Sequence, residues 1–215
     1  MCGRIFVKPG PAMRLFLESF GIDTDLPELN NLAPTEQVPV LTREEDQYRM
    51  GMMRWWLHPA WSPDAPSQAY AMFNARIETI LTSRAFKAPI AHRRGIVLAS
   101  GFVEWKTEGK QKLPHYCEPA DEAQPLALAA IWEVWQAQVW SCAIVTQPAD
   151  ARFCWLHDRM PLSLTREQAV SWMATEQDPK ALLASLSGQS VPLRIRQVEA
   201  NINNARHKVP PAFIE

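Results

Sequence analysis

The chain has 215 residues, of which 47% are hydrophobic and 21% charged, and its formal net charge is −1. This composition is typical of one globular domain and excludes a fully disordered chain. The near-neutral charge also excludes a protein that is basic overall, so any nucleic-acid site must be local.

Neither a secretory signal peptide nor a membrane span is predicted. The first residues are interrupted at Lys8, Pro9, Gly10 and Pro11, and no apolar run approaches the roughly 18–20 residues of a span. The four cysteines show no CxxC pair and no density typical of a disulfide framework. We therefore expect a cytoplasmic protein with free thiols and no membrane contact.

The predicted elements begin with a short strand, a turn at 9–11 and an amphipathic helix over 12–20. Strands are expected over 37–42 and 48–57, on either side of a charged turn. Runs rich in β-branched and aromatic residues predict further strands over 95–105, 113–119, 125–135 and 139–148.

Two helices are predicted near the C-terminus. Thr165, with Gln168 three residues later, caps a helix over 166–174, and Asp178 and Gly188 bound another over 178–188. Strands dominate the middle of the chain, and no repeat or linker marks a second domain. We expect an α+β, β-rich fold in which residues 1–215 form a single domain.

Cys2 directly follows the initiator methionine. If Met1 is removed, Cys2 carries an amine with a reference pKa of about 7.7–8.0 and a thiol with one of about 8.5, so both nucleophiles are accessible near neutral pH. The alternative is that Cys2 is a small apolar residue at the start of a strand.

Polar residues interrupt several apolar segments. Glu104, between Val103 and Trp105, can exchange a proton with a substrate, and His157, after an apolar run, can act as acid or base. Each also has a structural alternative: an ion pair for Glu104, and a hydrogen-bonded structural role for His157. Asn74 could likewise have a structural role, in which its side chain braces a turn or the backbone.

Residues 79–103 contain no acidic residue but include Arg84, Lys87, His92, Arg93 and Arg94. This stretch is either a solvated basic face or a phosphate-binding surface.

Metal and cofactor motifs are missing from the sequence. His115 and Cys117 lie two residues apart on a predicted strand, but no second pair at ligand spacing accompanies them. No P-loop, HExxH, GxSxG or GxGxxG motif occurs. We expect no metal site and no cofactor.

Five motifs together identify a resemblance. The chain contains "MCGR" at its start, "NLAPT" at 31–35, "NARIET" at 74–79, "GFVEW" at 101–105 and "HDRMPL" at 157–162. In this order, and spread over most of the chain, they resemble the SRAP family (SOS response-associated peptidase). Bacterial and vertebrate members of that family sense abasic sites in single-stranded DNA.

The resemblance implies a covalent reaction with an abasic site. Cys2 would be the nucleophile, forming a thiazolidine with the aldehyde of the ring-opened sugar. Glu104 would shuttle the proton that favours ring opening, His157 would act as acid or base at the aldehyde, and Asn74 would position Cys2. The peptidase activity of the family would be self-removal of Met1, which a general aminopeptidase could also perform.

The resemblance also implies a binding surface for single-stranded DNA that contains an abasic site. Arg4, Arg76 and Arg159 match positions that bind phosphates, for which guanidinium groups are well suited. Pro34 and Trp61 match an apolar wedge that stacks on bases. As alternatives to DNA binding, the three arginines could form salt bridges within the protein, and Trp61 could pack in the core. We expect a monomer.

Two other functions stay open at this point. One is a thiol peptidase that acts on other polypeptides through Cys2 or another cysteine with His157. The other is a non-catalytic module that binds single-stranded DNA, in which the polar residues only brace the fold.

Overall fold

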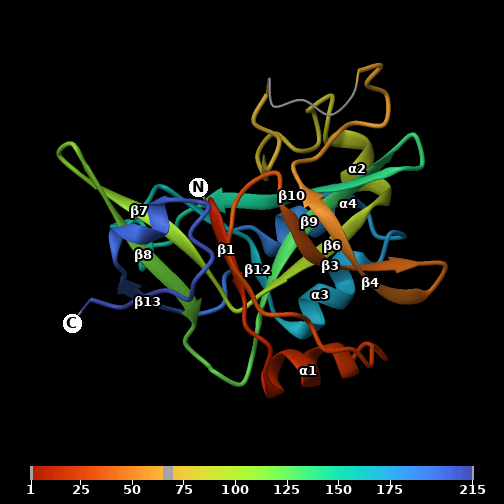
Figure 1. Ribbon diagram of the computed structural model, residues 1–215. Helices are drawn as coiled ribbons and strands as arrows, with labels where there is room; N and C mark the ends of the chain where they lie inside the picture. The colour runs from red at the N-terminus through yellow and green to blue at the C-terminus, as the bar shows by residue number, and fades with distance from the viewer. Residues whose placement is uncertain (1, 65–69, 215) are drawn as a thin grey trace.

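Two β-sheets form the centre of the structure, a computed structural model that describes residues 2–64 and 70–214. About 40% of the chain is strand and 16% helix. The first sheet has the order β13, β8, β7, β1, β2 (Figure 1), with bounds Leu193–Gln197, Gln111–Pro119, Gly101–Glu108, Arg4–Val7 and Leu29–Leu32.

The second sheet contains β3 to β6 and β9 to β12, and five of these strands close into a ring. β9 pairs with both β6 and β10, β6 pairs with β3, and β4 joins β3 to β10. Closure pairs the backbone groups that an open edge would expose. The strands are β3 Gln37–Glu44, β4 Gln47–Trp55, β5 Asn74–Arg76, β6 Arg94–Ala99, β9 Leu126–Trp135, β10 Val139–Pro148, β11 Arg159–Pro161 and β12 Ser163–Leu164.

One apolar core joins the two sheets. Ile5 and Phe102 of the first sheet belong to the same buried cluster as Val40 and Ile144 of the second. Figure 1 shows β1 lying between the β7–β8 hairpin on one side and β3 and β4 on the other. The expected α+β, β-rich, single-domain fold is confirmed.

The apolar run 95–105 forms two strands in different sheets, whereas the sequence predicted one. Ser100 lies at the break, where its backbone N–H donates to the Phe6 carbonyl oxygen at 2.8 Å. A Cβ at Gly101 would lie 2.3 Å from the ring of Tyr116, so only glycine lets this ring pack against the backbone. The break carries β7 out of the closed ring and places it beside β1.

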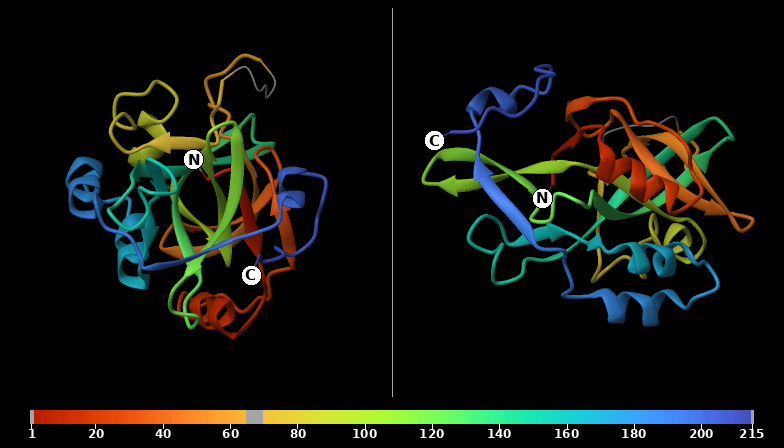
Figure 2. Two further views of the ribbon diagram at one scale, coloured as in Figure 1. Left: turned by 90° about the vertical axis from the view of Figure 1, so that its left-hand side faces the viewer. Right: turned by 90° about the horizontal axis from the view of Figure 1, so that it is seen from below.

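The helices lie around the outside of the sheets (Figure 2). The three predicted helices are confirmed, and their starts follow the expected capping: Thr165 and Gln168 form a capping box, and Asp178 accepts from the backbone N–H of Ala181. The short helix α2 was not predicted. The helical segments are α1 Pro11–Glu18, α2 Lys87–His92, α3 Arg166–Met173, α4 Pro179–Leu186 and the 3₁₀ turn η1 Ala200–Asn203.

Arg94 lies inside the protein and joins two helices, so its interpretation as part of a basic surface is wrong. It is 1% exposed. Its Nε donates to the Trp172 carbonyl oxygen at 2.6 Å, and its Nη atoms donate to the carbonyls of Ile90 and Ala174. These carbonyls lie near the C-terminal ends of α2 and α3, where a positive charge is favourable. Burial lowers the pKa of Arg94.

No helix in the described ranges 2–64 and 70–214 combines the length and apolar character that crossing a bilayer requires.

Candidate active site and nucleic-acid interface

Cys2 lies just before β1 and is fully buried. Burial raises the pKa of its thiol far above the ordinary value, and the negative charge of Glu104 raises it further. Cys117 on β8 is buried as well, and burial, Glu104 and Cys2 all raise the pKa of its thiol. Both thiols are therefore protonated at neutral pH in this arrangement.

Asn74 is brought to Cys2 by β5. This strand pairs in parallel with β10, with Asn74 opposite Ile144. The Asn74 Nδ2 donates to the Cys2 carbonyl oxygen at 3.2 Å. Its Oδ1 is buried and has no hydrogen-bond partner among the residues that the structure describes. Since a buried polar atom left unpaired costs about 1–3 kcal/mol, Oδ1 is an acceptor suited to a donor that enters the site.

Glu104 lies in the middle of β7 and is 2% exposed. Its Oε1 accepts a hydrogen bond from the backbone N–H of Trp105 at 3.2 Å. His115 lies directly opposite on β8, so the two side chains share one face of the sheet. β1 pairs antiparallel with β7, with Arg4 opposite Val103, so the residues that precede Arg4 run alongside Glu104. Cys2 and Glu104, 102 positions apart in the sequence, therefore meet in one buried site.

His157 precedes β11, and its Nδ1 has two neighbours. The backbone N–H of Arg159 lies 2.9 Å from Nδ1, and a carboxylate oxygen of Asp158 lies 2.8 Å from the same atom. The N–H donor fits a neutral ring with its proton on Nε2, whereas the carboxylate fits a ring that is protonated on Nδ1. The proton can thus sit on either ring nitrogen, with Nδ1 accepting from Arg159 in one arrangement and donating to Asp158 in the other.

The segment that leads into His157 packs on the strands that form the Cys2 and Glu104 site. The ring of Phe153 lies 6.1 Å from that of Phe102 on β7. The ring of Trp155 lies 5.4 Å from that of His115 on β8. These contacts place the segment on the face of the sheet that carries Glu104.

The arginines expected to bind phosphate differ in their surroundings. Arg76, two residues after Asn74 on β5, is exposed. Arg4 is half-buried, donates to the Asn203 carbonyl oxygen at 3.1 Å and lies over the Trp105 ring at 5.6 Å. Burial lowers the pKa of Arg4.

Arg159 has an acidic partner on the neighbouring segment. Its guanidinium pairs with both carboxylate oxygens of Glu78, and one Nη also donates to the Thr146 carbonyl oxygen at 2.8 Å. The salt-bridge interpretation of Arg159 thus describes the structure without DNA. A phosphate that binds Arg159 must compete with Glu78.

The two residues expected to form the wedge are accessible. Trp61 is 50% exposed, and Pro34 lies half-buried in the turn between β2 and β3. The guanidinium of Arg84 lies 4.1 Å from the centre of the Trp61 ring. The sequence placed Arg84 only within an acid-free stretch and gave no sign of this cation–π contact, because the contact joins two separate loops.

The sequence pattern of the family described as SOS response associated peptidase (SRAP) matches residues 1–205. The chain belongs to the SRAP family. This confirms the resemblance carried by the five motifs.

Curated relatives of this SRAP chain bear names that describe their activity. The abasic site processing protein YoqW of Bacillus subtilis is 30% identical over 206 residues, which cover 90% of this chain and 91% of YoqW. The abasic site processing protein YedK of Escherichia coli is 34% identical over 185 residues, which cover 82% of this chain and 81% of YedK.

Solved structures share the SRAP fold of this chain. A protein from Bacteroides thetaiotaomicron aligns with a TM-score of 0.77 at 22% identity, covering 93% of each chain. A phage-related protein from Bordetella bronchiseptica aligns with a TM-score of 0.75 at 23% identity, covering 97% of this chain and all of that one.

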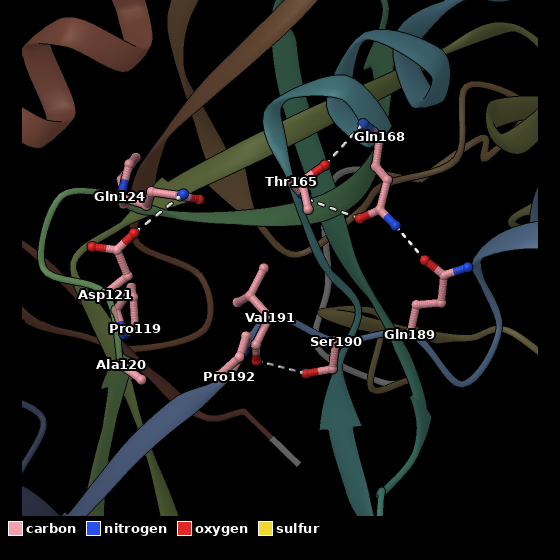
Figure 3. Close-up of a pocket in the computed structure, with 11 residues that line it drawn as sticks. Pro119, Ala120, Asp121, Gln124, Thr165, Gln168, Gln189, Ser190, Val191 and Pro192 are labelled. Carbon is pink, nitrogen blue, oxygen red and sulfur yellow. Dashed lines mark hydrogen bonds between the residues drawn. The ribbon is translucent and has the colours of Figure 1, made fainter.

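A cavity of about 590 Å³ on the SRAP domain lies apart from this site, between the segment after β8, the start of α3 and the segment before β13. Figure 3 shows that the polar groups around it bind one another: the Gln168 side chain accepts from the Thr165 backbone N–H and donates to Gln189, and Asp121 accepts from Gln124. None of the nine candidate site residues lines it. The cavity is therefore a feature separate from the candidate site.

Proposed function

We propose that this protein processes abasic sites in single-stranded DNA and, once Met1 has been removed, captures them covalently through Cys2. The observation that carries this proposal is the joint position of Cys2, Asn74 and Glu104: an amide donates to the Cys2 carbonyl oxygen, and the pairing of β1 with β7 brings a buried carboxylate beside the N-terminal residues. Membership of the SRAP family and the names of YoqW and YedK, both abasic site processing proteins, support the assignment of abasic DNA as the substrate.

The proposed reaction uses both nucleophiles of Cys2. The free amine attacks the aldehyde carbon of the ring-opened sugar, and loss of water gives an imine. The thiol sulfur then bonds to the imine carbon, and its proton passes to the nitrogen, which closes a five-membered thiazolidine. Because burial keeps the thiol protonated, the amine acts first and the thiol second.

The neighbouring residues move protons and hold the nucleophile. Glu104 takes a proton from the sugar hydroxyl and returns it to the ring oxygen as the ring opens. His157 donates to the aldehyde oxygen that leaves as water. Asn74 fixes the Cys2 carbonyl with Nδ2, and its Oδ1 is available to accept from the new amine. Such positioning contributes to rate by holding the reacting atoms at attack distance.

DNA reaches the site over the exposed residues around it. Arg76 and Arg4 bind phosphates, and Arg159 joins them when the phosphate displaces Glu78. Trp61, held by Arg84, and Pro34 stack against bases beside the lesion.

Removal of Met1 is a peptidase step that this SRAP chain performs on itself. A thiol peptidase that acts on other polypeptides through Cys2, Cys117 or Cys142 is disfavoured, because these thiols are fully buried and burial raises their pKa, whereas such an enzyme needs an accessible thiol with a lowered pKa.

The test is a crosslinking assay with protein shown by intact mass to begin at Cys2. Wild type should form a denaturant-resistant adduct with single-stranded DNA that contains an abasic site, and Cys2→Ala should form none. Cys154→Ala is the matched control, because Cys154 is exposed and its substitution should leave the adduct unchanged. Failure of processed wild type to form the adduct would refute the proposal.

A further inference from the structure

Three tryptophans in the described part of the chain expose about half of their surface. Trp61, Trp155 and Trp140 are 50%, 47% and 40% exposed. Trp61 is already assigned to the wedge. Trp140 stacks on Trp132 on the β9–β10 hairpin. Trp155 lies two residues before His157 and has no role in the function proposed so far.

Contacts with the strands of the candidate site hold Trp155 in place. Its ring meets the His115 ring nearly at right angles, at 5.4 Å. The Lys106 Nζ lies 5.6 Å from the centre of the same ring, while Lys106 also pairs with Glu108. Lys106 and Glu104 are two residues apart on β7, so they lie on the same face of that strand. Trp155 is therefore a braced aromatic ring beside the residues that carry the chemistry.

A fixed, half-exposed ring at this position suits a nucleobase. A base stacks on an aromatic side chain whatever its identity, and a ring that is already held loses little freedom when the base binds. An abasic nucleotide leaves each neighbouring base without one of its stacking partners. An aromatic ring beside the lesion replaces that partner.

We infer that Trp155 is the stacking platform for one nucleobase that directly flanks the abasic site, on the side of the lesion that faces β7 and β8. The inference rests on the proposed function. It adds a specificity determinant: the protein distinguishes an abasic site with an intact neighbouring base from one whose neighbour is also missing.

The test measures binding without chemistry, at fixed ionic strength, with the tetrahydrofuran analogue of an abasic site in a labelled single-stranded oligonucleotide. One oligonucleotide keeps both flanking bases, and two others replace the 5′ or the 3′ neighbour with a second analogue. Stacking is worth on the order of 1–3 kcal/mol per base, so wild type should lose about 5- to 150-fold in affinity on one of the two replacements.

Variants of Trp155 should lose this dependence on the flanking base. Trp155→Ala should bind the intact oligonucleotide about 5- to 150-fold more weakly than wild type does, but should match wild type on the oligonucleotide that lacks the stacked base. Trp155→Phe should keep most of the dependence. Trp140→Ala is the matched control and should behave as wild type. A misfolded variant would bind every oligonucleotide poorly, so its affinity for the oligonucleotide without the stacked base would fall below that of wild type.

Two results overturn the inference alone while wild type still forms the crosslink: equal affinity of Trp155→Ala and wild type for the intact oligonucleotide, or equal weakening of Trp155→Ala on all three. Wild type that neither crosslinks nor binds these oligonucleotides overturns both the inference and the proposed function.

Discussion

The buried thiols should make the folded protein less stable at alkaline pH. Cys2, Cys117 and Cys142 are fully buried, and burial raises the pKa of each thiol above the ordinary value of about 8.5–9. In the unfolded chain these thiols ionise near pH 9, while in the folded protein they keep their protons. The folded state then binds more protons than the unfolded state, so the free energy of unfolding falls as the pH rises through 9.

The size of the loss follows from the ordinary pKa. At pH 10, at least one unit above it, each buried thiol lowers the free energy of unfolding by roughly 1–2 kcal/mol relative to pH 7. Three thiols together remove about 4 kcal/mol, a large part of the roughly 5–15 kcal/mol that stabilises a typical domain. Burial also raises the pKa of Tyr116 to about 12, which adds a smaller loss of the same sign.

Urea unfolding at pH 7 and pH 10, with a reducing agent present, measures this loss. Cys142→Ala should lose about 3 kcal/mol instead of about 4 between the two pH values, because one of the three buried thiols is gone. Cys154→Ala, which removes an exposed thiol, should lose as much as wild type. If Cys142→Ala and wild type lose the same amount, burial of the Cys142 thiol does not contribute to the pH dependence, and the reasoning from thiol burial is refuted for this residue.

Three further predictions concern single residues. Arg94→Met should lower the free energy of unfolding, measured in urea, by about 1–3 kcal/mol for each buried carbonyl left without a donor; a loss under 1 kcal/mol would contradict the bonds described. Glu104→Gln should slow crosslink formation in a time course by about 10²–10⁴-fold without weakening binding; a wild-type rate would remove Glu104 from the mechanism. Arg84→Ala should weaken single-stranded DNA binding by about 2- to 5-fold, but should have no effect when Trp61 is already alanine; an effect in that background would give Arg84 an independent phosphate contact.

The local elements of this protein were predictable because neighbouring residues decide them. Thr165 with Gln168 and Asp178 start α3 and α4 through hydrogen bonds that span three residues. The charged turn between β3 and β4 adopts positive φ at Glu45 and Asp46, as a tight hairpin requires.

Eight of the nine candidate residues lie in five short motifs, and Trp61 lies outside them; the motifs also identified the family whose pattern matches residues 1–205. The motifs could name Cys2, Asn74 and Glu104 but not their geometry. Their convergence depends on β5 pairing with β10, and on the break at Ser100 that sends β7 to β1.

By itself, the sequence determined the β-rich fold class, the helix starts and the residue types available for the chemistry, because each of these follows from local spacing and side-chain properties. Only the tertiary structure decided that Arg94 lies inside, that Arg159 pairs with Glu78, and that Trp155 lies against His115. These outcomes depend on which distant segments meet. A side chain's partner and its burial are properties of the packed whole, and no local pattern encodes them.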